Sequence, residues 1–271
     1  MSHRFSRAAL ATTAALAATL ALSACGAASD DDESTLSVGA TAVPAAEILQ
    51  FVIDSGQAEE AGLTITVQEY ADYVTPNQAL SDGTNDANLF QHEPYLNLYN
   101  SESGDDLVAV GKVYLPPLAL YSKTVDDIAD LPDGASIALP NDASNESRAL
   151  LLLAAHGLIE TTDAPSTVAD ITANPRGFEF SEIDAASLPQ ALDEKDAAIV
   201  NFSFAAAAGL SSDLQLFAEG AESSYFNILA TRAELADDPR VATLYELLTS
   251  EETSAWILEQ YSGLVTPPAQ R

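Results

Sequence analysis

The sequence contains little cysteine, histidine or positive charge. Its 271 residues include a single cysteine, Cys25, and 3 histidines, and 10 basic residues face 41 acidic ones. One cysteine excludes an intrachain disulfide. With so few thiols and imidazoles we expect no transition-metal site and no cofactor. The excess negative charge would repel phosphate groups, so nucleic acid is not an expected partner.

Motifs of the common enzyme classes are also missing. The chain has no Gly-x-Ser-x-Gly elbow, no His-Glu-x-x-His pair and no Gly-Lys-Ser/Thr phosphate loop. His92 and Glu93 form a conceivable acid–base pair, but no nucleophile or set of metal ligands accompanies them. We therefore predict a protein that is not an enzyme.

The N-terminus has the features of an export signal. A basic start is followed by an apolar run, Ala8–Leu22, and then by small residues up to Cys25. The run is shorter than the roughly 20 residues that a membrane span requires. Leu22-Ser-Ala-Cys25 resembles the bacterial lipobox, in which the cysteine receives a lipid such as palmitate. The alternative is a chance cysteine in an ordinary signal peptide.

We therefore predict that residues 1–24 are a lipoprotein signal peptide and that residues 25–35 form the lipidated Cys25 and an acidic tether. The predicted mature chain keeps 8 of the 10 basic residues and all 41 acidic ones, for a net charge of −33. Its length suits one large domain or two smaller lobes. The expected location is the extracytoplasmic face of a bacterial cell membrane, with the protein attached through its lipid anchor.

Alternating hydrophobic patterns predict an α/β fold with largely parallel sheets. Residues 118–122 are expected to be extended and to form a possible crossing between lobes. The other predicted strands are residues 35–40, 63–67, 87–90, 107–113, 135–139, 178–183, 197–200 and 225–231. The predicted helices are residues 44–54, 75–82, 93–99, 144–156, 166–173, a segment opening at 187–189, 239–249 and 251–261.

Two segments of the chain resemble each other. Gln78–Ala87 and Gln190–Ala197 both read as a helix, a turn and the start of a strand. Each strand then delivers polar or aromatic residues at its C-terminal end, where ligands of open α/β sheets bind. This internal similarity suggests two lobes that face each other across a cleft, unless the short match arises by chance.

The segment from Pro140 to Leu153 is the strongest candidate for a binding element. Asp142, Ser144 and Asn145 are all suitable N-caps for a helix that Gly157 would end. A helix N-terminus attracts anions, and Arg148, one turn further on, adds a planar fork suited to a carboxylate or a phosphate. The alternative is that Arg148 pairs with one of the many acidic side chains of the chain.

Aromatic and amide side chains supply the rest of a possible ligand site. Asn201 and Asn227 lie at or near the ends of apolar strands, where an amide oxygen can accept from an ammonium group. The alternative roles are core packing for the rings and backbone pairing for the amides. The whole set suits a zwitterion with an unbranched apolar tail, and a thioether would gain contacts with ring edges. The rings expected to wall an apolar slot are Tyr73, Phe90, His92 and Tyr95.

Ordered blocks across almost the whole predicted mature chain resemble the NlpA-type methionine-binding lipoproteins, the substrate-binding subunits of methionine ABC importers. The blocks run in order from about Leu36 to Leu264. The residues that carry the resemblance are Val38-Gly-Ala-Thr-x-Val-Pro44, Asp72-Tyr73-Val-x-Pro76-Asn77, Asp86-Ala-Asn88-x-Phe90-Gln91-His92-x-Pro94-Tyr95, Val110-Gly-Lys112, Leu120-Tyr121-Ser122, Pro140-Asn141-Asp142-x-Ser144-Asn145-x-x-Arg148, Asp196-Ala-Ala-x-x-Asn201 and Ser224-Tyr225-x-Asn227.

The resemblance implies a two-lobed type II periplasmic-binding-protein fold with two crossing segments and a central cleft. Lobe 1 would comprise residues 36–118 and 227–271, and lobe 2 residues 119–226. Arg148 would hold the carboxylate of L-methionine, Asn201 and Asn227 would contact its backbone including the ammonium, and Asn145 would lie nearby. Its side chain would be enclosed by Tyr73, Phe90, His92 and Tyr95.

The expected function is capture of methionine by a monomeric, membrane-anchored protein that delivers it to an ABC importer permease. Two alternatives remain at this point. One is the same role for another small apolar amino acid or a methionyl peptide. The other is a surface adhesin or structural lipoprotein whose cleft is vestigial.

Overall fold

The structure of the protein is a computed structural model, and it describes residues 34–269. The predicted signal peptide, the lipidation site Cys25 and the tether as far as Glu33 lie outside these residues. Within residues 34–269 no helix combines the length and the apolar character that crossing a membrane requires.

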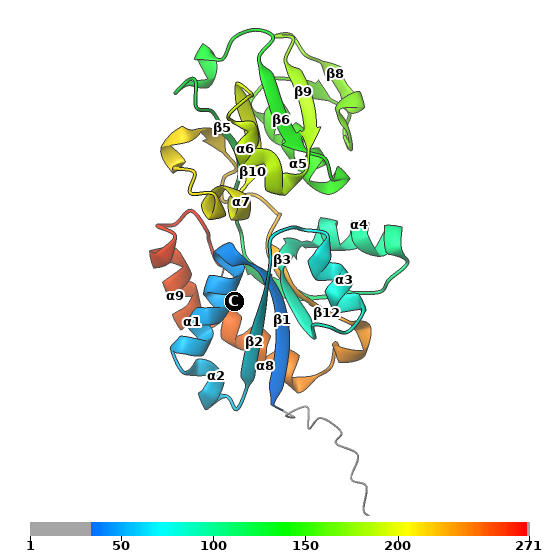
Figure 1. Ribbon diagram of the computed structural model, residues 1–271, viewed down its shortest axis with the longest axis vertical. Helices are drawn as coiled ribbons and strands as arrows, with labels where there is room; N and C mark the ends of the chain where they lie inside the picture. Colours follow the sequence, from blue (N-terminus) through cyan, green and yellow to red (C-terminus); the bar gives the residue numbers. More distant parts are fainter. Residues whose placement is uncertain (1–33, 270–271) are drawn as a thin grey trace, which may run out of the picture. The chain divides into compact units, whose positions relative to one another are not determined.

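Two five-stranded sheets with helices on both faces form the described part of the chain (Figure 1). This arrangement confirms the predicted α/β class. The first sheet has the order β2-β1-β3-β12-β4. Its strands are β2 (Thr64–Tyr70), β1 (Thr35–Thr41), β3 (Ala87–His92), β12 (Asn227–Thr231) and β4 (Val108–Tyr114).

The second sheet has the order β11-β5-β10-β6-β9. Its strands are β11 (Gln215–Ala218), β5 (Leu118–Tyr121), β10 (Ala197–Asn201), β6 (Ser136–Pro140) and β9 (Glu179–Ile183). A separate pair of short strands joins β7 (Glu160–Thr161) to β8 (Ile171–Ala173).

The predicted parallel character holds for only part of each sheet. Strand β1 is parallel to β2 and β3, whereas β12 runs antiparallel to both of its neighbours. Likewise β6 is parallel to β9 and β10, whereas β5 is antiparallel to β10 and β11. The two antiparallel strands follow the segments in which the chain passes from one sheet to the other. A strand reached by such a direct passage is free of the helical crossover that imposes parallel pairing.

Both faces of the first sheet are covered by helices. The helices α1 (Glu47–Asp54), α8 (Pro239–Leu248) and α9 (Glu251–Gln260) bury one apolar cluster with β1. The opposite face packs on α3 (Thr75–Ser81) and α4 (Glu93–Ser103) through Leu80 and Leu96. The short helix α2 (Gln57–Glu60) and the irregular turn at Ala42–Ala46 flank α1.

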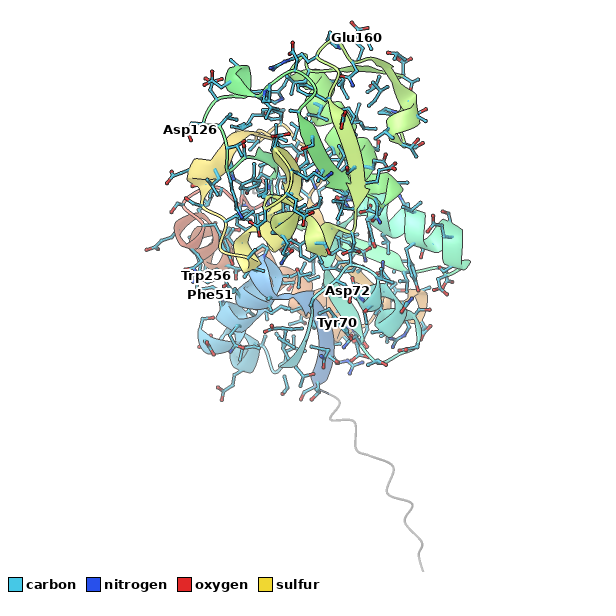
Figure 2. All side chains as sticks on the ribbon, turned by 45° about the horizontal axis from the view of Figure 1, so that its top comes forward. Phe51, Tyr70, Asp72, Asp126, Glu160 and Trp256 are labelled. Atoms are coloured by element: carbon cyan, nitrogen blue, oxygen red, sulfur yellow. The ribbon has the colours of Figure 1, made fainter. Side chains whose placement is uncertain are left out.

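Trp256 stacks on Phe51 in the α1–α9 layer. The ring centroids are 4.7 Å apart, and the two side chains lie side by side in Figure 2. Because Trp256 is the only tryptophan, its fluorescence reports on the packing of this layer.

The second sheet shows how strand alternation builds two cores. Leu118 and Leu120 of β5 face one apolar cluster, and Ala119 and Tyr121 face the other. The first cluster contains Leu150, Leu152 and Leu153 of α5 (Ala143–Ala155), and the second contains residues of α6 (Leu188–Ala191) and α7 (Phe202–Ala207). A sheet buried on both faces explains why its strands are apolar at successive positions.

The helix predicted from the Pro140–Leu153 segment is α5, and its ends follow the predicted capping chemistry. Of the three candidate N-caps, Asp142 takes the position, since its side chain accepts from the backbone N–H of Asn145. Gly157 follows the C-cap with φ of 70°, the left-handed conformation that glycine tolerates best.

The helix predicted for residues 166–173 is wrong. That segment contains one turn of 3-10 helix, Val168–Asp170, followed directly by β8. The carboxylate of Asp170 accepts from the backbone N–H groups of Ser166 and Thr167, which favours a local turn over a continuing helix. The helix α7 and the strands β7, β8 and β11 were not predicted.

The chain passes between the two sheets at two places. Residues 115–117 connect β4 to β5, and residues 219–226 connect β11 to β12. The first connection ends in Pro116-Pro117, which offers no backbone N–H to a ladder. The second connection begins beside the end of the first, because the backbone N–H of Glu219 donates at 2.9 Å to the carbonyl oxygen of Leu118, the first residue of β5.

Candidate functional site

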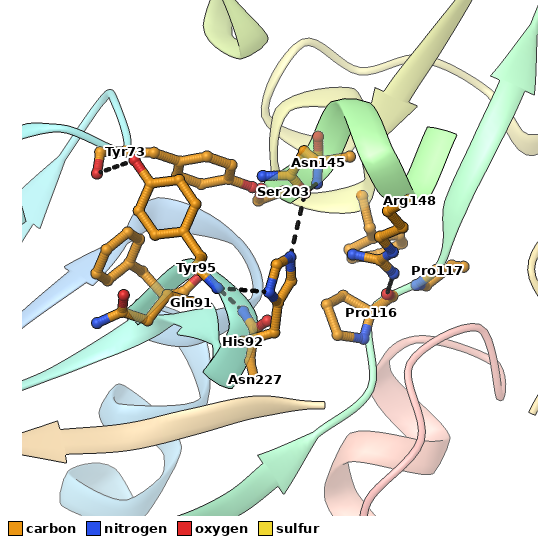
Figure 3. A pocket seen from close by; sticks show the side chains of 13 residues that line it. Tyr73, Gln91, His92, Tyr95, Pro116, Pro117, Asn145, Arg148, Ser203 and Asn227 are labelled. Carbon is orange, nitrogen blue, oxygen red and sulfur yellow. Dashed lines mark hydrogen bonds between the residues drawn. The ribbon is translucent and has the colours of Figure 1, made fainter. Parts of the chain in front are cut away.

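A cavity of about 20 Å³ lies where the C-terminal ends of β3 and β10 approach the start of α5 (Figure 3). Its lining comes from both sheets. All the predicted ligand-binding residues line this one cavity: Tyr73, Phe90, His92, Tyr95, Asn145, Arg148, Asn201 and Asn227. The remaining lining residues are Gln91, Pro116, Pro117, Phe202 and Ser203.

Arg148 lies on the first turns of α5 with only 2% of its surface exposed. Arg148 lines the cavity and also forms the ion pair with an acidic side chain that the sequence offered as the alternative, and its role as a ligand contact stays a prediction. Its Nε donates to Oε1 of Glu219 at 2.8 Å, and its Nη2 donates to the other oxygen of the same carboxylate and to the carbonyl of Pro116. Among residues 34–269, no hydrogen bond uses Nη1.

The guanidinium of Arg148 is also covered on one face. The ring of Tyr225 lies 4.6 Å from its central carbon, a cation–π contact. Glu219 therefore holds the Nε and Nη2 atoms of the guanidinium, and Tyr225 covers one of its faces. The Nη1 atom is the part that can meet an anionic group. This end suits a carboxylate better than a phosphate, because most of the five donors are already used.

A chain of hydrogen bonds connects the start of α5 with the end of β10. Asp142 accepts two bonds from the amide of Asn145, each 3.0 Å long. The Oδ1 atom of Asn145 in turn accepts from Nδ2 of Asn201 at 2.8 Å. This orientation turns the Oδ1 atom of Asn201 away from Asn145, and that oxygen is buried without a hydrogen-bond partner in the described part of the chain. A buried acceptor of this kind suits an ammonium group.

Asn227, the first residue of β12, lines the cavity from the first sheet. Its Nδ2 donates to the carbonyl oxygen of Phe90 at 2.8 Å and to the hydroxyl of Tyr114 at 2.9 Å. Both amide protons are used by the protein, so its side-chain oxygen is the atom left to face a ligand.

His92 contributes a neutral imidazole. Its Nδ1 accepts from the backbone N–H of Tyr95 at 3.2 Å, so the proton is assigned to Nε2, which lies 3.2 Å from Oδ1 of Asn145. Desolvation, reinforced by the charge of Arg148, lowers the pKa of His92 to about 3. The ring therefore serves as a donor and as an apolar wall at neutral pH.

The rings predicted to wall an apolar slot form one cluster that lines the cavity. The centroids of Tyr73, Phe90 and Tyr95 are 5.8 to 5.9 Å from one another. Phe204 of α7 joins Tyr73 at 4.5 Å. Such rings offer edges and faces to an apolar or thioether chain.

The hydroxyl of Tyr73 connects the two halves of the cavity. It shares a hydrogen bond with the hydroxyl of Ser203, which lies on α7 beyond the second sheet. Burial raises the pKa of Tyr73, so the phenol stays protonated. The hydroxyl of Tyr95 donates to the backbone carbonyl of Tyr73 at 2.9 Å and holds that segment in place.

Several cavity residues were missed by the sequence argument. Gln91 and Phe202 directly adjoin predicted residues, and Ser203 follows one position later, so continuity with those motifs was an available signal. Gln91 is oriented by Asn77, whose Nδ2 donates to it at 2.8 Å. Glu219 carried no signal, because it is one of 41 acidic residues and its partner is 71 positions away.

The cavity contains hydrogen-bonding groups and rings, but its lining includes no nucleophile with an adjacent base. Within residues 34–269 no group of three or more histidine, cysteine or acidic side chains is placed to hold a metal ion. What the arrangement offers is recognition of a small molecule with an anionic end, a cationic or hydrogen-donating centre and an apolar tail.

Two α/β lobes joined by two connections, with a polar cavity at the strand ends, define the periplasmic-binding-protein class. The family model for NlpA lipoproteins matches residues 36–269, and the chain belongs to this family. A probable D-methionine-binding lipoprotein of Vibrio cholerae is 36% identical over 264 residues, which cover 96% of this chain and 97% of that protein.

Solved structures agree with this assignment. A nutrient-binding protein from Burkholderia cenocepacia, solved bound to methionine, is 39% identical with a TM-score of 0.82, covering 86% of this chain and 100% of that one. Lipoprotein Tp32 from Treponema pallidum is 36% identical with a TM-score of 0.81, covering 86% of this chain and 98% of that one. The fold predicted from the resemblance is confirmed.

Proposed function

We propose that this protein is a lipid-anchored solute-binding protein that captures methionine and delivers it to an ABC importer. The observation that carries the proposal is the composition of the cavity. It combines the Nη1 end of Arg148, the buried Oδ1 of Asn201 and a cluster of aromatic rings. These three features match the carboxylate, the ammonium and the thioether chain of methionine.

The same geometry supports a role for each of the lining residues. Arg148 binds the carboxylate through Nη1, and the side-chain oxygens of Asn201 and Asn227 accept from the ammonium. Tyr73, Phe90, His92 and Tyr95 enclose the apolar chain, and Asn145 orients Asn201. The names of relatives support methionine as the ligand, since one is described as D-methionine-binding and another was solved bound to methionine.

Ligand capture on this proposal requires the lobes to move. A cavity of about 20 Å³ has room for roughly one water molecule, which is far less than an amino acid occupies. The predicted boundary after residue 118 shifts to residue 114, because Leu118 already pairs in the second sheet. Residues 34–114 with 227–269 form one lobe and residues 118–218 the other, and the connections 115–117 and 219–226 act as the hinge. Closure around the ligand produces the form that the permease distinguishes.

The anchoring part of the proposal depends on Cys25. Cleavage before Cys25 and its lipidation would keep a monomeric protein at the extracytoplasmic face of the membrane. Cys25→Ala should release the protein into the soluble fraction, as measured by fractionation of cells without detergent. A Cys25→Ala protein that still needs detergent for extraction contradicts the lipobox interpretation.

Calorimetric titration with a panel of amino acids tests the ligand. L-methionine, D-methionine, leucine, norleucine and a methionyl dipeptide separate the stereochemistry, the thioether and the length of the ligand. Heat from methionine with little from leucine supports the proposal. Preferential binding of another compound replaces methionine as the ligand, and no heat from any compound favours the adhesin alternative.

Substitution of Arg148 tests the site. Arg148→Lys keeps the charge but loses the fork, and we expect methionine binding to weaken by about 2 kcal/mol or more. Arg176→Lys is the matched control, because Arg176 also donates to backbone and carboxylate oxygens in lobe 2 but lies outside the cavity. Equal affinity in Arg148→Lys and the control would place the carboxylate elsewhere.

A further inference from the structure

Glu219 lies behind Arg148, in the connection between β11 and β12, and is not part of the cavity lining. Its side chain is 10% exposed. One carboxylate oxygen accepts from Nε of Arg148 at 2.8 Å, and the other accepts from Nη2 of Arg148 and from the backbone N–H of Leu118 at 3.1 Å. Three donors from two segments thus converge on a single buried carboxylate.

This carboxylate determines which part of Arg148 is available. With Nε and Nη2 engaged, the guanidinium is held in one orientation against the ring of Tyr225. A bidentate Arg–carboxylate pair is geometrically specific. A ligand carboxylate therefore meets the Nη1 end and does not displace the fork as a whole.

Glu219 also sets the charge of the site. Arg148 is the cationic residue of the cavity lining, and the neutral imidazole of His92 adds no charge. The carboxylate of Asp142 lies behind Asn145 and is occupied by its amide and backbone N–H groups. Glu219 therefore balances the charge of Arg148 before any ligand arrives. Because the dielectric constant of a buried site is low, the charge of Glu219 interacts strongly with Arg148 and with a bound ligand.

We propose that Glu219 is a positioning residue that selects ligands by their net charge, through its ion pair with Arg148. Its charge offsets that of Arg148, so a zwitterionic amino acid is preferred over an anion that has the same carboxylate and side chain but no ammonium group. The inference rests on the proposed function, since it assumes that Arg148 meets the ligand carboxylate.

The experiment compares L-methionine with 4-(methylthio)butanoate, which is methionine without its ammonium group. The ratio of the two affinities is measured by calorimetry for the wild type and for Glu219→Gln. We expect the wild type to prefer methionine, and Glu219→Gln to reduce that preference at least tenfold, because the uncompensated guanidinium favours the anion. The ratio is independent of the fraction of folded protein, so moderate destabilisation does not affect the result.

Two further variants separate charge from structure. Glu219→Asp keeps the charge and should retain most of the wild-type preference. Glu222→Gln removes an exposed carboxylate three residues along the same connection and should leave the preference unchanged. Glu219→Ala is the second charge-removing variant if Glu219→Gln fails to fold, and it should reduce the preference like Glu219→Gln.

The outcomes are distinguishable. A wild type that binds methionine while Glu219→Gln keeps the wild-type ratio overturns the role of Glu219 and leaves the proposed function intact. A wild type that binds 4-(methylthio)butanoate as tightly as methionine overturns the inference without any variant. A wild type that binds neither compound overturns the proposed function itself.

Discussion

The Nε2 atom of His92 lies 3.2 Å from the Oδ1 atom of Asn145, and this contact joins the end of β3 in the first sheet to the start of α5 beside the second. The same oxygen accepts from Asn201. This contact needs a proton on Nε2, and the bond from the backbone N–H of Tyr95 needs an acceptor at Nδ1, so the two together require the neutral imidazole. Protonation of Nδ1 would place two N–H donors face to face, and the hydrogen bond from the backbone N–H of Tyr95 would be lost.

The depressed pKa of His92 predicts a pH dependence of stability. Between the ordinary value of 6.5 and about 3, the unfolded chain binds a proton that the folded chain does not. The free energy of unfolding should therefore fall as the pH drops below 6.5, by up to about 1 kcal/mol per pH unit from this group. Urea denaturation followed by Trp256 fluorescence measures this slope.

The control for this prediction is a change of histidine elsewhere. His92→Gln should reduce the slope between pH 6.5 and pH 4, and the same substitution at His156, exposed at the end of α5, controls for replacing a histidine. An unchanged slope in His92→Gln would mean that other groups cause the acid sensitivity.

The raised pKa of Glu146 predicts that stability depends on pH in the opposite direction. Desolvation and the neighbouring Glu182 raise the pKa of Glu146 to about 7, from a usual value of 4.5. Between these values the folded chain keeps a proton that the unfolded chain has lost, so stability should decrease as the pH rises from 4.5 to 7. Glu146→Gln should flatten this part of the profile and stabilise the protein above pH 7.

Denaturation of Glu146→Gln across this range checks the prediction. Glu179→Gln, which changes an exposed glutamate on the neighbouring strand β9, is the matched control. If both variants show the same profile as the wild type, the proton on Glu146 is not the cause. The backbone N–H of Val168, which donates to Glu146 at 2.7 Å, can still be satisfied by the glutamine oxygen.

Asn201→Ala should weaken methionine binding more than it weakens the fold. The Oδ1 atom that it removes has no partner among residues 34–269, so the fold loses only the hydrogen bond from Nδ2 to Asn145. In the complex the same atom would accept from the ammonium, and we expect a loss of about 1–3 kcal/mol in binding. Calorimetry and urea denaturation of the same sample measure the two effects.

A second asparagine provides the reverse pattern. Asn100 of α4 bonds to both backbone groups of Leu107 and lies outside the cavity. Asn100→Ala should destabilise the protein without changing its affinity for methionine. Similar losses of affinity in both variants would indicate a general structural effect and not a ligand contact.

The hydrogen bond between Tyr73 and Ser203 should slow the release of the ligand. It connects the β2–α3 loop with α7 across the cavity, so it must break when the lobes part. Tyr73→Phe should raise the dissociation rate about fivefold, which corresponds to roughly 1 kcal/mol. Stopped-flow measurement of ligand release gives this rate.

A double-mutant cycle isolates the contact. Ser203→Ala should have a similar effect, and combining it with Tyr73→Phe should add little further, because both changes remove the same bond. Tyr95→Phe, which loses a bond to the backbone of Tyr73 within one lobe, is the control. Fully additive effects on the dissociation rate would contradict a shared bond.

Local features of the fold are determined by the sequence itself. The Asp142 cap, the Gly157 stop and the alternation of β5 and β6 follow from side-chain chemistry and from the two-residue period of a strand. The candidate binding residues stand out as polar or aromatic side chains directly after apolar strands. Such signals involve neighbouring residues, so a single sequence contains them.

Pairs of residues that lie far apart in the chain cannot be predicted from such local signals. Arg148 and Glu219 are 71 residues apart, and Tyr73 and Ser203 are 130 apart. With 41 acidic residues available, nothing local marks Glu219 as the partner of Arg148. Only the packing of two sheets, with the chain passing between them twice, selects one carboxylate and one hydroxyl from many. Folding thereby brings a recognisable set of candidate binding side chains together around one cavity.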